Sequence, residues 1–567
     1  MEHLVTTSSD VSAGESAAQR GRAALTSWTL AQPADLFADD AAFNALVSAH
    51  GLDDRRPSFH ETGRVVAGPL DRVVRTNNVH RNLPVLDDYD GVGNFTARIA
   101  HHPSWWAAGR YIYGTGIMAA YGESPTPHRY ILSLFYLTAQ AGEAGHNCPL
   151  ACAAGAIRTL QVLGTETQKG GALARLLDPN FDTNWTASQF LTEVQGGSDV
   201  GANALQATPL EPLDVAAAPG GRWRLDGEKW FCSNADADVF LVTARVAPPD
   251  TGTRGLGLFV VPRLLADGTP NGFSVRRLKD KLGTRSMASG EIDFTGAQAE
   301  ALGPVTQGFK SVIELVITTS RLYNAMGCAA HARRAWVVAS TYAQHRTAFG
   351  QPIGQFPQVQ ETLAWMRADA EASFAGTLML AGLLEAIDQG HASETERAFF
   401  RLAVNLNKLQ TAVLAHAVVN HGIEVLGGNG AIESFSILPR LLRDNVVYEN
   451  WEGSHNVLRA QVLRDCGRYG FHTGFFAFLR ERLPADGAAL DADEAELNDL
   501  LQASAPLADL RFRRLAHRMA TWVMLAGLAR AETLCDAAAL TRRHLAPLPV
   551  DEAYLATIGR LQRPGGA

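Results

Sequence analysis

The fold is decided between residues 223 and 278, where four short runs favour β-strands: Trp223-Arg224-Leu225, VFLVTARV at 239–246, LGLFVVP at 256–262 and FSVRRL at 273–278. These runs are rich in β-branched and aromatic residues, and the turn formers PGG, PPDTGT and ADGTPNG lie beside them. Strands spaced this closely, with no helix between them, indicate an antiparallel sandwich or barrel. No glycine fingerprint of the GxGxxG type follows a strand, so a dinucleotide-binding βαβ unit is not indicated.

Helical patterns lie on both sides of this β region. Four long apolar and alanine-rich segments predict a helix bundle, and they lie near 308–345, 357–388, 393–427 and 437–466. The fold class is therefore mainly α with a central β domain. The predicted divisions are a flexible or loosely docked arm (1–40), an N-terminal helical domain (41–185), a β domain (186–304), the bundle (305–466) and a C-terminal helical extension (467–567).

Composition narrows the class of protein. The chain has 567 residues, of which 46% are hydrophobic and 19% charged, and its formal net charge is -8, so neither disorder nor a generally cationic surface for nucleic acid is indicated. The six cysteines are scattered and predict a reduced, cytoplasmic protein without a structural metal. We expect no export signal and no membrane span, because no apolar run of sufficient length is present.

Two stretches at the edges of the β region carry residues that suit a flat, phosphate-bearing ligand. In LTEVQGGSDV at 191–200, glycines free the backbone N–H groups beside Thr192 and Ser198, although an ordinary loop would look the same. In GEKWFCSNA at 227–235, Phe231 offers an aromatic face and Ser233 a hydroxyl donor. The alternative for the second stretch is a strand that ends in a turn.

Three stretches in the bundle region carry the remaining candidates. RTAFG at 346–350 offers a guanidinium for a diphosphate, and LGGNG at 426–430 is too rich in glycine for ordinary helix. A surface arginine at a helix end and a loose connection between helices are the alternatives. In NWEGSHN at 450–456, Glu452 lies between a tryptophan and a glycine. A carboxylate in a desolvated aromatic pocket has a raised pKa that suits a general base, whereas a solvated acid near a helix start is the alternative.

Taken in order, these strings resemble the acyl-CoA dehydrogenase superfamily. The strings are TE..GSD, GEKWF.SNA.AD, R.AFG, LGGNG and WEGS, and the match runs from about residue 130 to 465. EAG..CP at 143–149, LKDKLG.RS.AS at 278–289 and the extra C-terminal helices are most similar to the AidB branch, the bacterial alkylation-response flavoproteins. The resemblance implies an N-terminal helical domain, a central β-barrel and a four-helix bundle, with FAD between them and a homotetramer as the assembly.

The resemblance also implies roles for individual residues. Thr192, Gly197 and Ser198 match positions at the flavin ring and its phosphate side, and Phe231 and Ser233 match positions at the isoalloxazine ring. Contacts with a neighbouring subunit's FAD fall on Arg346, Phe349, Glu424, Gly427, Gly428 and Gly430, and positions beside the flavin fall on Ser454 and Asn456. Pro357 stands where many relatives carry a glutamine that contacts this FAD.

The implied reaction is dehydrogenation of an acyl-CoA or related acyl thioester, in which Glu452 removes the α-proton and the flavin accepts the β-hydride. Some relatives carry the base in the preceding bundle helix, where this chain has Ser320, so Glu452 is the only acid at a matching position. Arg321 and Trp451 are assigned to the substrate side, and the bulk of Trp451 favours a short or unusually shaped acyl group. The expected electron acceptor is an electron carrier or O₂.

A rival function is DNA binding or DNA protection through the C-terminal extension. Residues 467–567 contain 12 Arg and no Lys against 12 Asp and Glu, so the extension is formally neutral. Arg511, Arg513, Arg514 and Arg518 could still form a local basic patch, although a solvated or salt-bridged helix face fits the same pattern. We therefore rank DNA binding below dehydrogenation.

Overall fold

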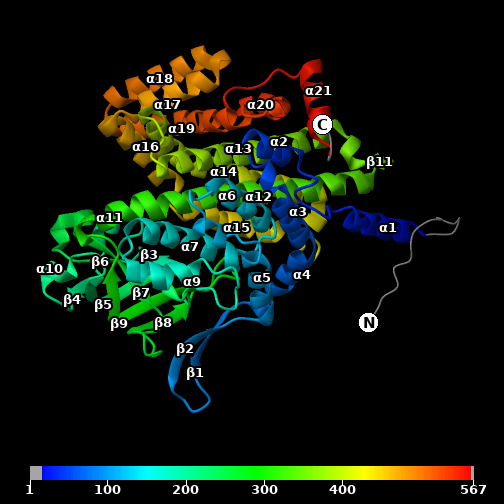
Figure 1. The fold of residues 1–567 in the computed structure, drawn as a ribbon. Helices are drawn as coiled ribbons and strands as arrows, with labels where there is room; N and C mark the ends of the chain where they lie inside the picture. The colour runs from blue at the N-terminus through cyan, green and yellow to red at the C-terminus, as the bar shows by residue number, and fades with distance from the viewer. Residues whose placement is uncertain (1–15, 564–567) are drawn as a thin grey trace.

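The computed structural model describes residues 16–563 of the chain. Figure 1 shows a β-barrel at the lower left, long bundle helices across the middle and the C-terminal helices on top. The fold class predicted from the sequence is confirmed, because the chain is mostly helical around a central closed β-barrel.

The region before the barrel is mainly helical. Its longer helices are α2 (Ala41–Ala49), α3 (Arg56–Val65), α4 (Asp71–Asn77), α5 (Pro103–Tyr113), α6 (His128–Ala139) and α7 (Ala144–Leu163). Most side chains of α6 and α7 are buried, since α6 packs on the bundle and α7 packs between the bundle and the barrel. A hairpin of β1 (Val85–Tyr89) and β2 (Phe95–Ala100) interrupts the predicted helical pattern, and its turn forms where the Asp90 carboxylate accepts backbone N–H groups.

The predicted N-terminal arm differs from expectation where the structure describes it. Residues 1–15 lie outside the described residues, but Ala17–Leu30 form helix α1, which begins with a capping box at Ser16. Trp28 is 6% exposed, stacks on Phe435 and donates from Nε1 to Thr341 Oγ1 at 3.2 Å. One buried tryptophan thus holds α1 against the bundle, and the Ser- and Ala-rich composition gave no sign of this contact.

Seven strands form the barrel. They are β3 (Ala187–Phe190), β4 (Gln206–Pro209), β5 (Arg222–Ser233), β6 (Val239–Arg245), β7 (Leu256–Pro262), β8 (Phe273–Leu278) and β9 (Ser289–Ala301). The ring closes through β6–β4–β5–β9–β7 and back to β6, while β3 pairs with β6 and β8 with β9. The four predicted strands correspond to β5 to β8. The long β9 was not predicted, because its glycines, alanines and acids carry little strand preference.

The bundle is built from α12 (Thr318–His345), α13 (Pro357–Asp388), α14 (Glu394–Leu426), α15 (Leu438–Asn450) and α16 (His455–Tyr469). The fourth predicted segment is therefore two helices, separated at residues 451–454. By length and composition α13 is apolar enough to cross a membrane, with a mean hydropathy of 1.3, but 83% of that window is buried among the described residues. Such burial is typical of a core helix.

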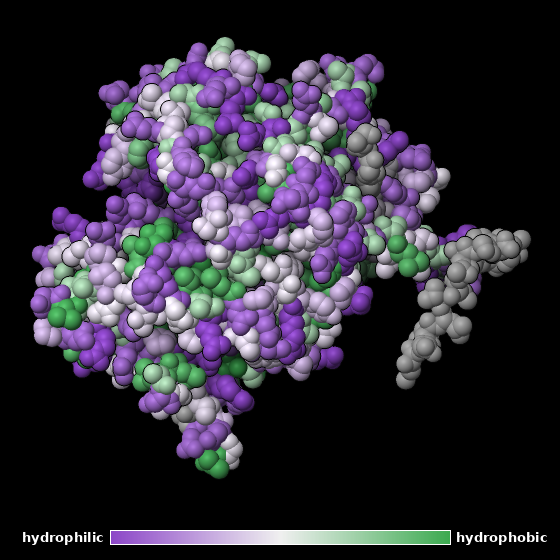
Figure 2. All heavy atoms as spheres, in the orientation of Figure 1, coloured by the Kyte–Doolittle hydropathy of each residue, from purple (hydrophilic) through white to green (hydrophobic). Residues whose placement is uncertain are grey.

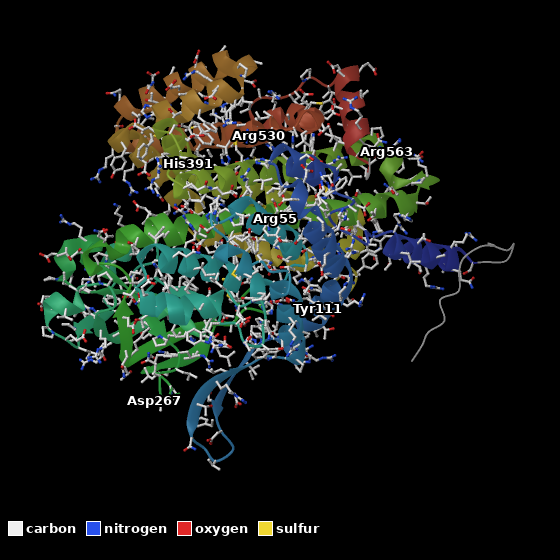
Figure 3. All side chains as sticks on the ribbon, in the orientation of Figure 1. Arg55, Tyr111, Asp267, His391, Arg530 and Arg563 are labelled. Atoms are coloured by element: carbon white, nitrogen blue, oxygen red, sulfur yellow. The ribbon has the colours of Figure 1, made fainter. Side chains whose placement is uncertain are left out.

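The C-terminal extension packs on α13 and α14. Its helices are α17 (Phe471–Arg482), α18 (Gly487–Gln502), α19 (Ala505–Leu528), α20 (Cys535–Thr541) and α21 (Glu552–Leu561). Asp369 of α13 is 5% exposed and accepts from Arg543 at 2.6 Å and from His544 at 2.8 Å, which ties the extension to the bundle. Figure 3 shows Arg530 of the C-terminal extension far from Asp267 at the end of the barrel. Figure 2 shows hydrophilic side chains over most of the visible face of the protein.

Candidate active site

The break between α15 and α16 forms a tight loop that carries Glu452. Trp451 ends α15, and the chain then passes through positive φ angles of 58° at Glu452 and 102° at Gly453. Glycine adopts such angles freely, whereas a glutamate there costs about 1 to 2 kcal/mol. A strained acid is kept only where the surroundings hold it, so this conformation marks Glu452 as a candidate functional residue.

Two buried cations hold this loop by its backbone carbonyls. Arg321 of α12 donates from Nε to Glu452 O at 3.0 Å. Lys408 of α14 donates from Nζ to Glu449 O at 3.1 Å and to Gly453 O at 3.0 Å. Burial lowers the pKa of Lys408 to about 8 and that of Arg321 to about 10, although Glu452 nearby favours their charged forms. The loop is therefore fixed from two bundle helices.

The Glu452 carboxylate is enclosed and only half satisfied. Its Oε1 accepts from Gln189 Nε2 at 3.3 Å, whereas its Oε2 is buried and has no hydrogen-bond partner among residues 16–563. The residue as a whole is partly exposed, but this oxygen is not. Burial raises the pKa of Glu452 from 4.5 to about 7, and Arg321, Lys408 and Gln189 partly oppose that rise. The group is therefore suited to exchange a proton near neutral pH.

A narrow cavity of about 30 Å³ lies in front of this carboxylate. It has walls from α7, β3, α12 and the end of α15, and among its lining residues are Asn147, Cys152, Gln189, Ser320, Asn324 and Trp451. Gln189 also donates to Ser320 Oγ at 3.0 Å, so it links Glu452 to the alternative position considered in the sequence analysis. Among residues 16–563, no second carboxylate lines the cavity.

Strand β3 joins this cavity to the first two sequence motifs. Ser188 donates from its hydroxyl to the backbone oxygen of Ser233, while its neighbour Gln189 faces the cavity. Two residues after β3, Thr192 O accepts from Trp230 N at 2.9 Å. Thr192 also lies beside Gly197, where an added Cβ would meet the threonine methyl at 3.6 Å. Thr192, Gly197 and Ser233 are thus held along one edge of the barrel, next to the cavity.

A buried ion pair fixes the loop that carries Thr192 and Ser198. Lys229 of β5 donates to Glu193 Oε1 at 2.7 Å, and the same carboxylate accepts from the N–H groups of Ala204 and Leu205. On the same strand Phe231 keeps 57% of its surface exposed, and Lys279 lies 4.7 Å from its ring centroid. This edge offers an exposed aromatic face beside a fixed glycine loop.

The third and fourth motifs meet at one end of the bundle. Arg346 lines a cavity of about 300 Å³ together with Arg20 and Trp28 of α1 and with Tyr342. The Tyr342 hydroxyl accepts from Asn429 Nδ2 at 3.2 Å, so the turn that contains Gly427, Gly428 and Gly430 lies beside this cavity. Phe349 follows at a positive φ of 51° and is 98% exposed, and the Glu424 side chain is 77% exposed.

The remaining predicted residues lie around the base loop. Ser454 stands at the N-cap of α16 without a capping hydrogen bond from its side chain. Asn456 accepts from Arg459, which contacts His517 of the C-terminal extension. Trp451 lines the cavity, but Arg321, predicted on the substrate side, points at the loop backbone and at Asn405 instead. Glu452 and Trp451 therefore both line the cavity, whereas Arg321 contacts the backbone of the loop that carries them.

The residues present fit FAD, the cofactor that the sequence predicts. Gly427 and Gly428 have open space where a Cβ would stand, so a ligand can approach their backbone. Phe231 and Phe349 expose aromatic faces, and Arg346 supplies a guanidinium of the kind that engages diphosphates. A second binding region lies where the Glu452 cavity meets the barrel edge, and both offer polar groups to a ligand.

Sequence reasoning missed four residues that shape the site. Glu193 and Lys229 lie inside motifs that were recognised, so their opposite charges were a usable signal. Gln189 and Lys408 lie in a short strand and in a long apolar helix, and only the folded chain brings them to Glu452. Local sequence carried no sign of either contact.

Comparisons with known proteins agree with this geometry. Residues 29–183 match the adaptive response protein AidB N-terminal domain, residues 188–297 the acyl-CoA dehydrogenase middle domain and residues 306–466 the acyl-CoA dehydrogenase C-terminal domain. The chain is 33% identical to acyl-CoA dehydrogenase family member 11 of Caenorhabditis elegans over 67% of its own length and 62% of that protein. It is 33% identical to the putative acyl-CoA dehydrogenase AidB of Escherichia coli K12 over 68% of its own length and 69% of that protein.

A solved structure extends the match to the whole fold. The structure of Caenorhabditis elegans ACDH-11 in complex with C11-CoA has a TM-score of 0.78 and 25% sequence identity, and the match covers 94% of this chain and 93% of that chain. The coverage therefore includes the region beyond the bundle as well as the three domains matched above.

Proposed function

This chain belongs to the acyl-CoA dehydrogenase family of FAD-dependent oxidoreductases, and from that premise we propose that it dehydrogenates an acyl thioester with Glu452 as the base. When bound, FAD supplies the two-electron acceptor for the substrate's β-hydride. The observation that carries the proposal is the free Oε2 of Glu452, which is buried at the cavity and belongs to a carboxyl with a pKa of about 7.

The residues around the cavity support removal of an α-proton. A thioester carbonyl acidifies the neighbouring C–H, and the base must approach that carbon in its ionised form. Gln189 orients one oxygen of Glu452 and leaves the other for the proton. Arg321 and Lys408 fix the loop, and their charges keep the pKa of Glu452 from rising further. A useful fraction of the Glu452 carboxyl groups is therefore ionised at neutral pH. Ser320, at the alternative position, cannot take this role.

The cofactor contacts remain part of the proposal. Thr192, Gly197, Ser198, Phe231 and Ser233 would hold the flavin at the barrel edge, with Ser454 and Asn456 beside it. The exposed set around Arg346, Phe349 and the Glu424–Gly430 turn suits the adenosine and diphosphate of FAD bound by a second copy of this chain. A homotetramer, a cytoplasmic location and an electron carrier or O₂ as acceptor follow as proposals of the same kind.

The substrate class is supported by the relative solved with C11-CoA and limited by the cavity. The cavity, of about 30 Å³, is far smaller than a typical ligand pocket, and Trp451 occupies part of the wall beside the base. We therefore expect a short acyl group on the CoA or related thioester.

DNA binding finds less support. Arg518, one of the four arginines of the predicted patch, is paired with Asp493 at 2.7 Å and with Glu496. Arg480 is paired with Asp491 and Glu494 in the same way. Acids of α18 thus neutralise arginines of α17 and α19. A salt-sensitive gel shift with DNA at physiological ionic strength would support DNA binding again.

The deciding experiment is anaerobic mixing of the FAD-loaded protein with short, branched, aromatic and long acyl-CoAs while the flavin absorbance is followed. Bleaching by one class is expected for the unchanged protein and not for Glu452→Gln. The matched control is Glu433→Gln, which makes the same change at an exposed carboxylate paired with Arg443. An absence of bleaching by every acyl-CoA, with flavin that dithionite still reduces, would contradict the proposal.

A further inference from the structure

The end of the cavity away from Glu452 contains a buried amide with nothing to bind. Asn147 of α7 is 2% exposed and lines the cavity, and neither its Oδ1 nor its Nδ2 has a hydrogen-bond partner among the described residues. Burial raises the pKa of the neighbouring Tyr448 hydroxyl, and an interaction with the Asn147 amide partly opposes that rise. A buried amide without hydrogen-bond partners destabilises the protein, so Asn147 is placed to accept a hydrogen bond from a ligand and to donate one to it.

The neighbouring amide of Asn324 already has hydrogen-bond partners within the protein. Asn324 of α12 donates from Nδ2 to Tyr448 O at 3.0 Å and accepts from the Cys328 thiol at 3.7 Å. Asn147 therefore differs from its neighbour, because neither of its amide atoms has a hydrogen-bond partner within residues 16–563 that meets ordinary geometric criteria.

Helix geometry gives the separation between the two ends. Cys152 lies near Glu452 in the cavity wall. It follows Asn147 by five residues on α7. Ser320, joined to Glu452 through Gln189, lies four residues before Asn324 on α12. At 1.5 Å per residue, each amide lies about 6 to 7.5 Å along its own helix from the residue that neighbours the base. An extended acyl chain covers that distance from its α-carbon in roughly five bonds.

The charges at this end favour a neutral group over a carboxylate. Lys281, which lies near Cys148 of the cavity wall, already donates its ammonium to Met287 O at 2.7 Å and to Ser289 Oγ at 2.8 Å. Asp444, whose burial raises its pKa to about 6, lies near Tyr448 and would repel an anion. A carboxylate at this position would therefore lack the free cation that a buried charge requires.

Building on the proposed function, we propose that the preferred substrate is a short acyl thioester that ends in a neutral hydrogen-bonding group, such as a carboxamide, and that Asn147 is the specificity-determining residue. A carboxamide pairs with Asn147 through one donated and one accepted hydrogen bond, which uses both unpaired atoms. An apolar group of the same shape would leave both atoms unpaired, so it should bind more weakly.

Three CoA thioesters of nearly equal shape test the proposal: 6-amino-6-oxohexanoyl-CoA, 6-methylheptanoyl-CoA and 5-carboxypentanoyl-CoA. The measurements are the anaerobic rate of flavin bleaching and, on FAD-loaded Glu452→Gln, the Kd without turnover. The amide should bind and react at least about tenfold better than the branched alkyl and the carboxylate compounds. Equal or stronger binding of the alkyl compound would overturn the proposal, as would a preference for the carboxylate.

Asn147→Leu provides the second arm. The variant should lose the amide preference and gain binding of the alkyl compound, a reversal that a misfolded protein would not give. Gln161→Leu is the matched control, because it makes a similar change on α7 at a side chain that donates to Tyr121 O outside the cavity. Its preference should not change. Bleaching by none of the three compounds, nor by any acyl-CoA, would count against the proposed function, whereas bleaching with an alkyl preference would count against this inference alone.

Discussion

Replacement of Glu452 by glutamine should stabilise the protein, and the gain should grow with pH. The reason is the buried carboxyl, whose pKa is about 7 in the folded chain and 4.5 in its ordinary state. Below pH 4.5 the group is neutral in both states and favours neither. As pH rises the unfolded chain ionises first, so the folded state becomes less favourable until the pH passes 7 and the difference levels off. Glutamine does not ionise, so the variant has no pH dependence of stability from this position.

The magnitude follows from the difference between the two pKa values. The full effect above pH 7 is about 3 kcal/mol, at 1.36 kcal/mol for each unit of pKa, and part of it is already present at pH 5. Between pH 5 and pH 8.5 the advantage of Glu452→Gln should therefore grow by about 2 to 3 kcal/mol. For a chain of this length, with an unfolding entropy near 2.1 cal/mol/K per residue, that is an increase of about 2 °C in the difference between melting temperatures.

Differential scanning calorimetry on both proteins, at matched FAD and protein concentration and at a series of pH values, measures this difference. Only the change with pH is diagnostic, because a fixed offset between the proteins could come from packing of the amide. Glu433→Gln, at an exposed carboxylate, should show a far smaller change. Parallel melting curves across the pH range, or a growing disadvantage of Glu452→Gln above pH 7, would refute the electrostatic account of this site.

Three further predictions concern the same machinery. The rate of anaerobic flavin reduction by an acyl-CoA should rise up to tenfold per pH unit below about pH 7 and level off above it, because the base must be ionised; a rate that falls with pH would contradict this. Lys408→Met should raise the apparent pKa of that profile and slow the reaction at pH 7 about tenfold or more, since it removes a nearby cation and two hydrogen bonds to the loop; an unmoved pKa would exclude the electrostatic role. Arg346→Met should weaken FAD binding, measured by flavin fluorescence, by about tenfold or more while the pH profile of the remaining loaded enzyme stays fixed; unchanged affinity would remove Arg346 from the cofactor site.

The sequence was informative where one local pattern determines one local structure. The runs at 239–246 and 256–262 became paired strands because branched residues fill both faces of a barrel wall. The glycine-rich stretch at 426–430 ended helix α14, as predicted, because Gly427 has a positive φ. The break at 451–454 was not predicted, since the segment at 437–466 was expected to be one helix. Glu452 was identified through its motif, and its buried environment agrees with the raised pKa expected for an acid beside a tryptophan.

The sequence was silent where distant residues meet. Lys408 and Gln189 reach Glu452 from 44 and 263 positions away in the numbering, so no window of sequence contains the contact. The docking of α1 depends on one tryptophan against Phe435 and Thr341. The orphan amide of Asn147 is visible only as a missing partner, and a missing partner can be recognised only after every other side chain has been placed.

The most direct test of the central claim is the anaerobic rate of flavin reduction in FAD-loaded unchanged protein and in Glu452→Gln, with the acyl-CoA that bleaches the unchanged protein fastest. If Glu452 is the base, the variant should keep its FAD and lose about 10²- to 10⁴-fold in rate. A variant that reduces its flavin at the rate of the unchanged protein would show that another group removes the α-proton, and the account of this site would fail.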